Sequence, residues 1–125
     1  MDVLHTAIWV SDLEQQLAFY TELFDLDQSR EFTGDDGVLN TYVKGTGAAE
    51  IQFKSRPDSS VEVSPSGIDH LAIAVEDVEA VVDRAVDEWG STVTNGPKVM
   101  DDKGIKIAFF TDPEGYIVEV IEQLA

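Results

Sequence analysis

An internal repeat constrains the fold of this 125-residue chain more than any other feature of its sequence. Residues 5–14 read HTAIWVSDLE and residues 70–79 read HLAIAVEDVE, so six of the ten positions are identical. Each copy passes from alternating apolar residues, a pattern typical of a strand, into apolar residues at helical spacing. A repeat of this kind predicts that the chain consists of two similar supersecondary modules.

The helix pattern in each copy has its own boundary signals and its own apolar stripe. In the first copy Ser11 is expected to cap the helix, with Glu14 completing a capping box. In the second copy Gly90 is expected to end the helix, as glycine commonly does. The residues expected on the buried stripes are Leu13, Leu17, Tyr20 and Phe24 in the first helix, and Val78, Val81, Val82, Ala85 and Trp89 in the second.

Three short strand-like runs follow each helix, which predicts the order strand–helix–strand–strand–strand twice over. The residues 55–66, SRPDSSVEVSPS, are polar and contain proline, as a connector should, and DPEG at 112–115 signals a turn. We therefore expect one α+β domain of two tandem βαβββ modules, 1–54 and 67–125, joined by a linker. The expected strand ranges are 28–34, 38–44 and 48–54 in the first module, and 92–100, 104–111 and 116–123 in the second.

The charge balance is strongly acidic, with 8 Lys plus Arg against 25 Asp plus Glu and a formal net charge of −17. Such a surface argues against binding to nucleic acid or to anionic lipid. Self-repulsion on this scale is best tolerated where salt screens it, so we interpret the acidity as adaptation to a salt-rich cytoplasm, the alternative being an acidic mesophilic surface. The absence of cysteine excludes disulfides and thiolate ligands. The lack of a signal-like N-terminus or a membrane-length apolar run predicts a cytoplasmic protein.

The two histidines of the chain, His5 and His70, occupy equivalent positions in the two first strands. Because side chains alternate along a strand, each histidine shares a face with small or aromatic neighbours. These neighbours are Ala7 and Trp9 in the first strand, and Ala72 and Ala74 in the second. The opposite faces, Leu4–Ile8–Val10 and Leu71–Ile73–Val75, are more uniformly apolar and suit packing under the helices.

The closing strand of each module carries an acid, Glu50 in GAAEIQF and Glu119 in GYIVEVIE. Glu119 is flanked by apolar residues, and a partly buried carboxylate usually needs a partner such as a metal. Two imidazoles and two carboxylates suit a divalent ion, so His5, Glu50, His70 and Glu119 form a candidate site for Ni, Zn or Co, or for Mn or Fe. Each residue alone is more often an ordinary strand residue than a ligand. Gln52, on the same strand face as Glu50, is the alternative ligand.

These segments resemble the vicinal-oxygen-chelate superfamily, and within it glyoxalase I of the short bacterial type. The matching segments are HTAIWVSDLEQQLAFYTELF, IDHLAIAVEDVE and IAFFTDPEGYIVEVIE. The resemblance implies paired modules that form a curved mixed sheet around one metal, held by His5, Glu50, His70 and Glu119. It also implies a homodimer whose sites combine the first pair from one chain with the second pair from the other. Glu119 would move a proton between adjacent carbons of a hemithioacetal, with Glu50 as ligand and candidate second base, giving an S-lactoyl thioester.

Two residues depart from the pattern of the glutathione-using enzymes. Trp9 stands where these enzymes typically carry an arginine that grips the carboxylate of the thiol, and Lys54 stands where an asparagine is often found. Another thiol, such as γ-glutamylcysteine, is therefore a candidate substrate component. The residues that could contact it are Trp9, Lys54, Arg56, Lys98 and Lys103, although Trp9 could equally serve core packing and each cation could be solvated surface.

Three other functions remain open within the same superfamily. Extradiol dioxygenases use two His and one Glu on Fe²⁺, which His5, His70 and Glu119 could supply. Methylmalonyl-CoA epimerases typically place Gln at the fourth-strand position, so that function is favoured if Gln52 faces the metal. Antibiotic-sequestering proteins of this fold bind a drug without metal and commonly lack the four ligands.

Overall fold

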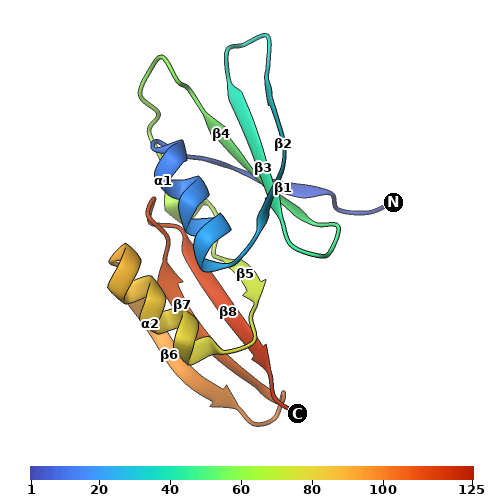
Figure 1. Cartoon of the computed structure of the whole chain (residues 1–125), viewed down its shortest axis with the longest axis vertical. Coiled ribbons are helices and arrows are strands. Elements are labelled where there is room, and N and C mark those ends of the chain that lie inside the picture. The colour runs from blue at the N-terminus through green and yellow to red at the C-terminus, as the bar shows by residue number, and fades with distance from the viewer. The chain divides into compact units, whose positions relative to one another are not determined.

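A computed structural model describes all 125 residues. The chain divides into two compact units, Met1–Ser64 and Pro65–Ala125. Each unit contains a helical segment and one four-stranded sheet, in the order strand, helix, three strands (Figure 1). The prediction of two βαβββ modules in an α+β fold is therefore confirmed, with the eight strands divided between two mixed sheets.

In the first unit the sheet order is β1-β4-β3-β2. The edge strand β1 pairs in parallel with β4, and the other two pairings are antiparallel. A parallel pair needs a crossover connection, and here the crossover includes the helix and two further strands. The elements are β1 (His5–Trp9), α1 (Leu13–Ala18), the π-helical segment η1 (Phe19–Leu23), β2 (Asp27–Thr33), β3 (Leu39–Lys44) and β4 (Glu50–Ser55).

The start of α1 differs from the sequence prediction. The side chain of Asp12, not that of Ser11, accepts a hydrogen bond from the backbone N–H of Gln15 at 3.1 Å. Asp12 has a non-helical backbone conformation, so it is the residue whose oxygen can reach the first free N–H groups. The predicted capping box at Ser11 is therefore wrong by one residue.

The buried stripe of this helical segment is also shifted. Tyr20 is buried as expected, and its ring lies 5.4 Å from that of Phe53 on β4, centroid to centroid. The other buried apolar side chains, however, are Phe19 and Leu23, while the predicted stripe residues Leu13, Leu17 and Phe24 are half-buried. Because η1 is π-helical, it holds more residues per turn than an α-helix, which shifts the buried position at its end from Phe24 to Leu23. Leu13 and Leu17 precede η1 in α1, where the buried residue is Gln16.

The second unit repeats the arrangement with the sheet order β5-β8-β7-β6, where β5 pairs in parallel with β8. Asp77 caps α2 by accepting from the N–H of Ala80 at 3.1 Å, and Gly90 ends the helix with φ 66°, as predicted. The elements are the 3₁₀ turn η2 (Pro65–Gly67), β5 (Leu71–Ala74), α2 (Val78–Trp89), β6 (Val93–Met100), β7 (Ile105–Thr111) and β8 (Ile117–Gln123). Of the expected stripe, Val78, Val82 and Ala85 are buried, and Val81 and Trp89 are half-buried.

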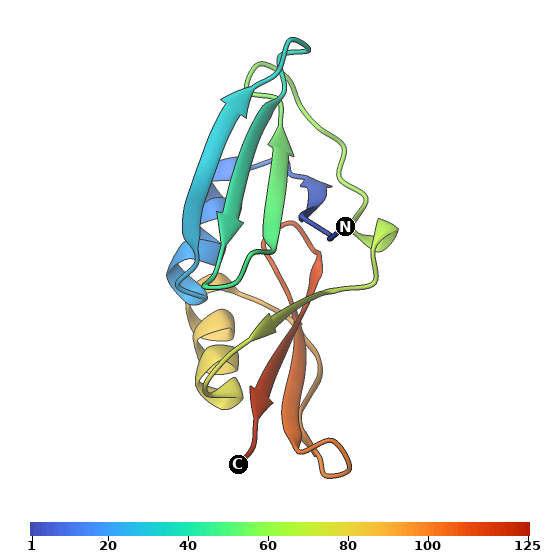
Figure 2. The same ribbon diagram turned by 90° about the vertical axis from the view of Figure 1, so that its right-hand side faces the viewer.

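In each unit the helical segment covers one face of its own sheet and leaves the other face turned away from it (Figure 2). Ile8 and Val10 are buried on the covered side of β1, whereas the face turned away carries His5 and Trp9. This agrees with the predicted alternation, except that Leu4 precedes the strand and is 67% exposed. No helix of the chain combines the length and the hydropathy needed to cross a membrane.

Candidate metal centre

Strand register decides which side chains accompany each histidine. In the first unit His5 lies directly opposite Glu50 on β4, and Ala7 lies opposite Gln52. Because the two strands are paired in parallel, all four residues project from the same sheet face, the one turned away from the helix. Both Glu50 and Gln52 are therefore on the face that the sequence predicted for a metal ligand.

In the second unit the histidine and the fourth-strand glutamate are not directly opposite each other. Glu119 lies opposite Ala72, two residues beyond His70. In the first unit the residue two positions beyond His5 is Ala7, and the residue opposite Ala7 is Gln52. The predicted equivalence of Glu50 and Glu119 rested on similar residue spacings, and strand register shifts it by two positions. The metal-ligand role of Glu50 itself stays a prediction.

Aromatic residues on the neighbouring strands mark the same equivalence independently. Tyr42 on β3 lies opposite Gln52, and Phe109 on β7 lies opposite Glu119. Each aromatic ring contacts the histidine of its own unit edge to face, with 5.6 Å between ring centroids in both cases. The histidine, the aromatic ring and the fourth-strand side chain therefore form the same triangle in both units. The fourth-strand side chain is the amide of Gln52 in the first unit and the carboxylate of Glu119 in the second.

The second unit brings His70 and Glu119 into direct contact. His70 Nε2 lies 3.2 Å from Glu119 Oε1, and His70 Nδ1 lies 2.7 Å from Asp69 Oδ2. Both ring nitrogens of His70 thus face a carboxylate oxygen, and Nε2 and the Glu119 oxygen are the two atoms that a cation beside them would contact. With metal–ligand bonds of roughly 2.1 Å, two atoms this far apart subtend an angle of about 100° at a metal, close to that of adjacent ligands. The pair therefore fits a divalent ion.

Glu50 is held by its own unit in a different way. The hydroxyl of Ser29 donates to one carboxylate oxygen, and Arg30 Nη2 lies 3.3 Å from the other. The Ser29 hydrogen bond, together with the nearby charge of Arg30, keeps the pKa of the Glu50 carboxyl below its usual value. The Arg30 guanidinium in turn lies 3.9 Å from the centre of the Tyr42 ring. These partners come from β2 and β3, so the pattern along β4 does not predict them.

Gln52 is 6% exposed and is bound through its nitrogen. Its Nε2 donates to Asn40 Oδ1 at 2.8 Å, and the same Asn40 oxygen accepts from Lys54 Nζ at 3.1 Å. The carbonyl oxygen of Gln52 accepts no hydrogen bond from another residue of the chain. An amide oxygen is a competent ligand for a divalent cation, so the free end of this side chain suits the predicted site.

The predicted substrate-binding residues lie in two places. Trp9 and Lys54 are opposite each other in register, and the Trp9 ring is flanked by Lys54 Nζ at 5.4 Å and by the Arg56 guanidinium at 5.2 Å from its centroid. Lys98 on β6 and Lys103 in the following turn belong to the second unit and are exposed. The structure thus groups Trp9 with Lys54 and Arg56, and a half-buried Trp9 faces the two cations.

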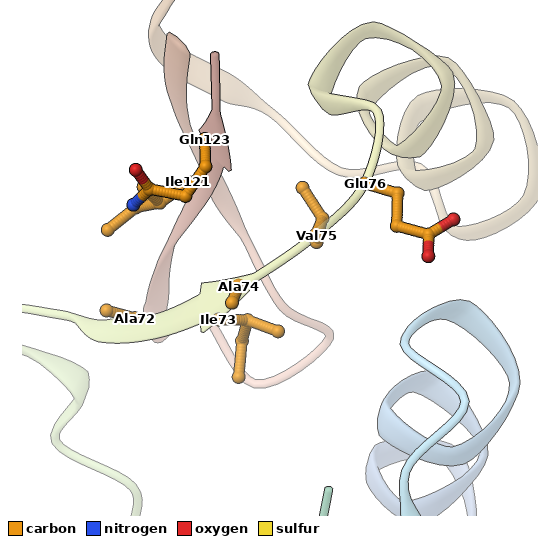
Figure 3. A pocket seen from close by; sticks show the side chains of 7 residues that line it. All are labelled: Ala72, Ile73, Ala74, Val75, Glu76, Ile121 and Gln123. Carbon is orange, nitrogen blue, oxygen red and sulfur yellow. The ribbon is translucent and has the colours of Figure 1, made fainter. Parts of the chain in front are cut away.

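A pocket of about 580 Å³ opens in the second unit at the edge strand β5. It is lined by residues of β5, β8 and the segment after β5: Ala72, Ile73, Ala74, Val75, Glu76, Ile121 and Gln123 (Figure 3). Ala72 is also the register partner of Glu119, so the pocket adjoins the His70–Glu119 pair. His70 and Glu119 do not themselves line the pocket, so the room expected beside His70 stays a prediction.

Neither unit gathers three or more His, Asp or Glu side chains into a group that could hold a metal by itself. The first unit presents His5 with Gln52 and Glu50 on one sheet face. The second presents the contacting pair His70 and Glu119. Neither unit alone presents the predicted set of four ligands.

Comparison with known proteins identifies the family. Residues 2–120 match the Glyoxalase/Bleomycin resistance protein/Dioxygenase superfamily. The chain belongs to this superfamily. A probable lactoylglutathione lyase from Synechocystis sp. is 30% identical over 126 residues, which cover 98% of this chain and 95% of that protein. A lactoylglutathione lyase from Haemophilus influenzae is also 30% identical, over 98% of this chain and 93% of its own length.

A solved structure supports the superfamily fold. A glyoxalase I variant from Zea mays superimposes with a TM-score of 0.80 at 24% identity. The match covers 98% of this chain and 45% of the maize chain. The modest identity makes this a likeness of fold, whereas the two bacterial relatives support a glyoxalase-type enzyme.

Proposed function

We propose that this protein is a metal-dependent glyoxalase I-type lyase, which isomerises the hemithioacetal of methylglyoxal and a small thiol to an S-lactoyl thioester. The observation that carries the proposal is the contact between His70 Nε2 and Glu119 Oε1, 3.2 Å apart, in a chain similar along its whole length to lactoylglutathione lyases. A histidine and a carboxylate in this arrangement can serve both as ligands and as a proton-transfer group.

The proposed ligands of the divalent metal are His5, His70, Glu119 and one side chain of β4. Sequence spacing favoured Glu50 for the last position, and strand register favours Gln52. The carboxylate of Glu50 already accepts from Ser29 and pairs with Arg30, whereas the oxygen of Gln52 has no donor. We therefore assign Gln52 as the fourth ligand. A bound Ni, Zn or Co ion, or Mn or Fe, would act as a Lewis acid toward the adjacent oxygens of the substrate.

Glu119 is the proposed proton carrier. It takes the proton from the carbon that bears the sulfur and returns it to the neighbouring carbon, so that the hydroxyl and carbonyl positions exchange and no atom is gained or lost. Its side chain is 15% exposed, which leaves access for a substrate and limits competition from water. The pocket beside Ala72 would receive the apolar end of the substrate.

We further propose a homodimer, in which each site takes His5 and Gln52 from one chain and His70 and Glu119 from its partner. The support is that the ligands occur as two partial sets, one in each unit, together with the expectation from the family resemblance. Size-exclusion chromatography with light scattering measures the state directly. A monomer that binds metal at full stoichiometry would contradict the shared site.

The thiol is proposed to carry a carboxylate and to differ from glutathione. Lys54 and Arg56 flank Trp9, and neither forms an ion pair with any of the 25 acidic residues of the chain. Two cations left unpaired in so acidic a chain favour binding of an external anion. γ-Glutamylcysteine has suitable chemistry, and the exposed Lys98 and Lys103 are further candidates for its charge.

The test is the appearance of thioester absorbance after methylglyoxal is mixed with glutathione or with γ-glutamylcysteine, in high salt. The protein is assayed as purified, after EDTA, after metal is restored, and as the Glu119→Gln variant. Metal-dependent thioester formation that the variant loses supports the lyase. Bound metal without thioester from either thiol would contradict it.

One observation favours a second candidate, a methylmalonyl-CoA epimerase-type reaction. That observation is the amide of Gln52 at the register position equivalent to Glu119. The epimerase also removes a proton beside a carbonyl, and Glu119 would serve as the base for that step. Exchange of the methylmalonyl-CoA proton into D₂O, without thioester formation in the lyase assay, would support this reaction in place of the lyase.

A further inference from the structure

We propose that Asn40 and Lys54 are positioning residues that fix the polarity of the Gln52 amide, so that its oxygen and not its nitrogen is available to a metal. The inference deepens the proposed function and rests on Gln52 as a ligand. The starting observation is a row of three polar side chains on β4 and β3, joined through a single acceptor atom, Asn40 Oδ1.

The two ends of an amide look alike in shape, but their partners distinguish them. Lys54 Nζ carries only donors, so the Asn40 atom 3.1 Å from it has to be the oxygen. The Val38 carbonyl accepts only, so the Asn40 atom 3.1 Å from it has to be the nitrogen. Asn40 is thus held in one orientation from both sides.

That orientation determines the orientation of Gln52. Asn40 Oδ1 can only accept, so the Gln52 atom 2.8 Å away has to be Nε2. The carbonyl oxygen of Gln52 is then the other end of the amide, the one that accepts no hydrogen bond. A flipped Gln52 would place two oxygens against each other in a site where Gln52 is 6% and Asn40 3% exposed, which is costly.

The arrangement also separates the roles of the two side chains of β4 that could be ligands. Glu50 has no contact with Asn40, and its partners are Ser29 and Arg30. Gln52 is joined to Asn40 in the way that outer partners orient a ligand in metal sites. Replacement of such partners typically weakens metal binding about 10- to 100-fold.

The experiment is a double-mutant cycle on Ni²⁺ affinity, measured by calorimetry on the full chain without substrate. Asn40→Leu is expected to weaken Ni²⁺ binding about 10- to 100-fold in the wild-type background, and to change it less than about twofold when Gln52→Ala is already present. An equal loss in both backgrounds would show that Asn40 acts on the fold and overturn the inference.

Lys54 offers a milder variant with a matched control. Lys54→Met removes the donor to Asn40, whereas Arg56→Met removes a neighbouring cation from the same Trp9 ring without touching Asn40. Lys54→Met is expected to weaken Ni²⁺ binding more than Arg56→Met, and Lys54→Arg to restore it. Equal effects of Lys54→Met and Arg56→Met would overturn the role of Lys54.

A metal-free readout separates this inference from the proposed function. In the wild-type protein the NMR signals of the Gln52 side-chain NH₂ should be protected from solvent exchange, and Asn40→Leu should remove the protection. If the Gln52 NH₂ is protected from exchange but the protein binds no Ni²⁺, the proposed orientation of the amide is supported and the proposed metal site is refuted. Ni²⁺ binding that depends on His70 but not on Gln52→Ala would overturn the inference and leave the metal site in place.

Discussion

The most informative perturbation is the paired replacement of two side chains on the same strand face, Gln52→Ala and Glu50→Ala. Structural metal sites with four ligands bind with about 10–16 kcal/mol, so one ligand accounts for about 3 kcal/mol, or roughly 100-fold in affinity. Gln52→Ala is therefore expected to weaken Ni²⁺ binding by about 100-fold.

Glu50→Ala is expected to have a small effect on the same measurement. Residues two apart along a strand are roughly 7 Å apart, and salt screens most of a charge effect at that distance, which leaves a change of about fivefold at most. Glu50 is also engaged by Ser29 and Arg30, so its removal frees those two groups instead of emptying a ligand position.

The assay is calorimetric titration of the EDTA-treated variants with Ni²⁺ in 1 M KCl, with circular dichroism to confirm that each variant folds. If Glu50→Ala loses about 100-fold in Ni²⁺ affinity and Gln52→Ala keeps the wild-type affinity, Glu50 is the ligand from β4 and the assignment of Gln52 from strand register is refuted. If neither changes the affinity, the ligand from β4 is assigned to the wrong strand face.

Three further predictions concern stability. Because its partners lower the pKa of Glu50, the stabilisation that this carboxylate contributes is present above the ordinary pKa of Glu and is lost as the pH falls through the lowered value. The free energies of urea unfolding of the wild type and of Glu50→Gln should therefore differ at pH 7 and converge in acid. A difference that grows in acid would contradict this direction. Because the chain carries a net charge of −17, its thermal unfolding midpoint should rise as KCl is increased from 0.1 to 2 M. The reason is that the screening length falls from about 10 Å at 0.1 M to about 3 Å at 1 M. A midpoint that stays flat or falls in differential scanning calorimetry would argue against salt adaptation. The side chain of Asp112 accepts hydrogen bonds from the backbone N–H groups of Glu114 and Tyr116, at 2.9 and 3.0 Å, in the turn before β8. Asp112→Ala should therefore lower the free energy of unfolding by about 1–3 kcal/mol in a denaturant titration. Asp102→Ala, in an exposed turn, is the control and should change it little.

Much of the fold could be predicted from the sequence because the repeat carries it. The six identities between residues 5–14 and 70–79 fall on the strand and the start of the helix, where the side-chain requirements of the two units are the same. Gly90 was predictable as a helix end because its left-handed backbone conformation favours glycine. The cap at Asp12 and the buried Phe19 were not, because a one-residue shift of the cap and a π-helical turn leave no distinct pattern in the apolar spacing.

The sequence predicts the two histidines of the candidate site by their matching places, whereas a choice of the fourth-strand residue also needs the strand register. His5 and His70 are the only histidines and lie at matching places, so spacing alone identified them. The choice between Glu50 and Gln52 depends on how β4 and β8 align with their parallel partners, and unequal connections before these strands shift the residue count. The orienting role of Asn40 depends on contacts between separate strands, which no local pattern reports.

The difference between Gln52 and Glu119 has a consequence for the stereochemistry of the proposed lyase reaction. A duplicated scaffold in its symmetric form would offer a carboxylate at both equivalent positions, and two bases on opposite sides of a substrate can remove a proton from one side and deliver a solvent-derived proton from the other. Here the first unit carries an amide at this position, and an amide neither gains nor loses a proton near neutral pH. If Glu119 is the single proton carrier of the proposed lyase reaction, the proton is expected to return to the neighbouring carbon on the side from which it was removed, whereas an epimerase would need a second group on the opposite side.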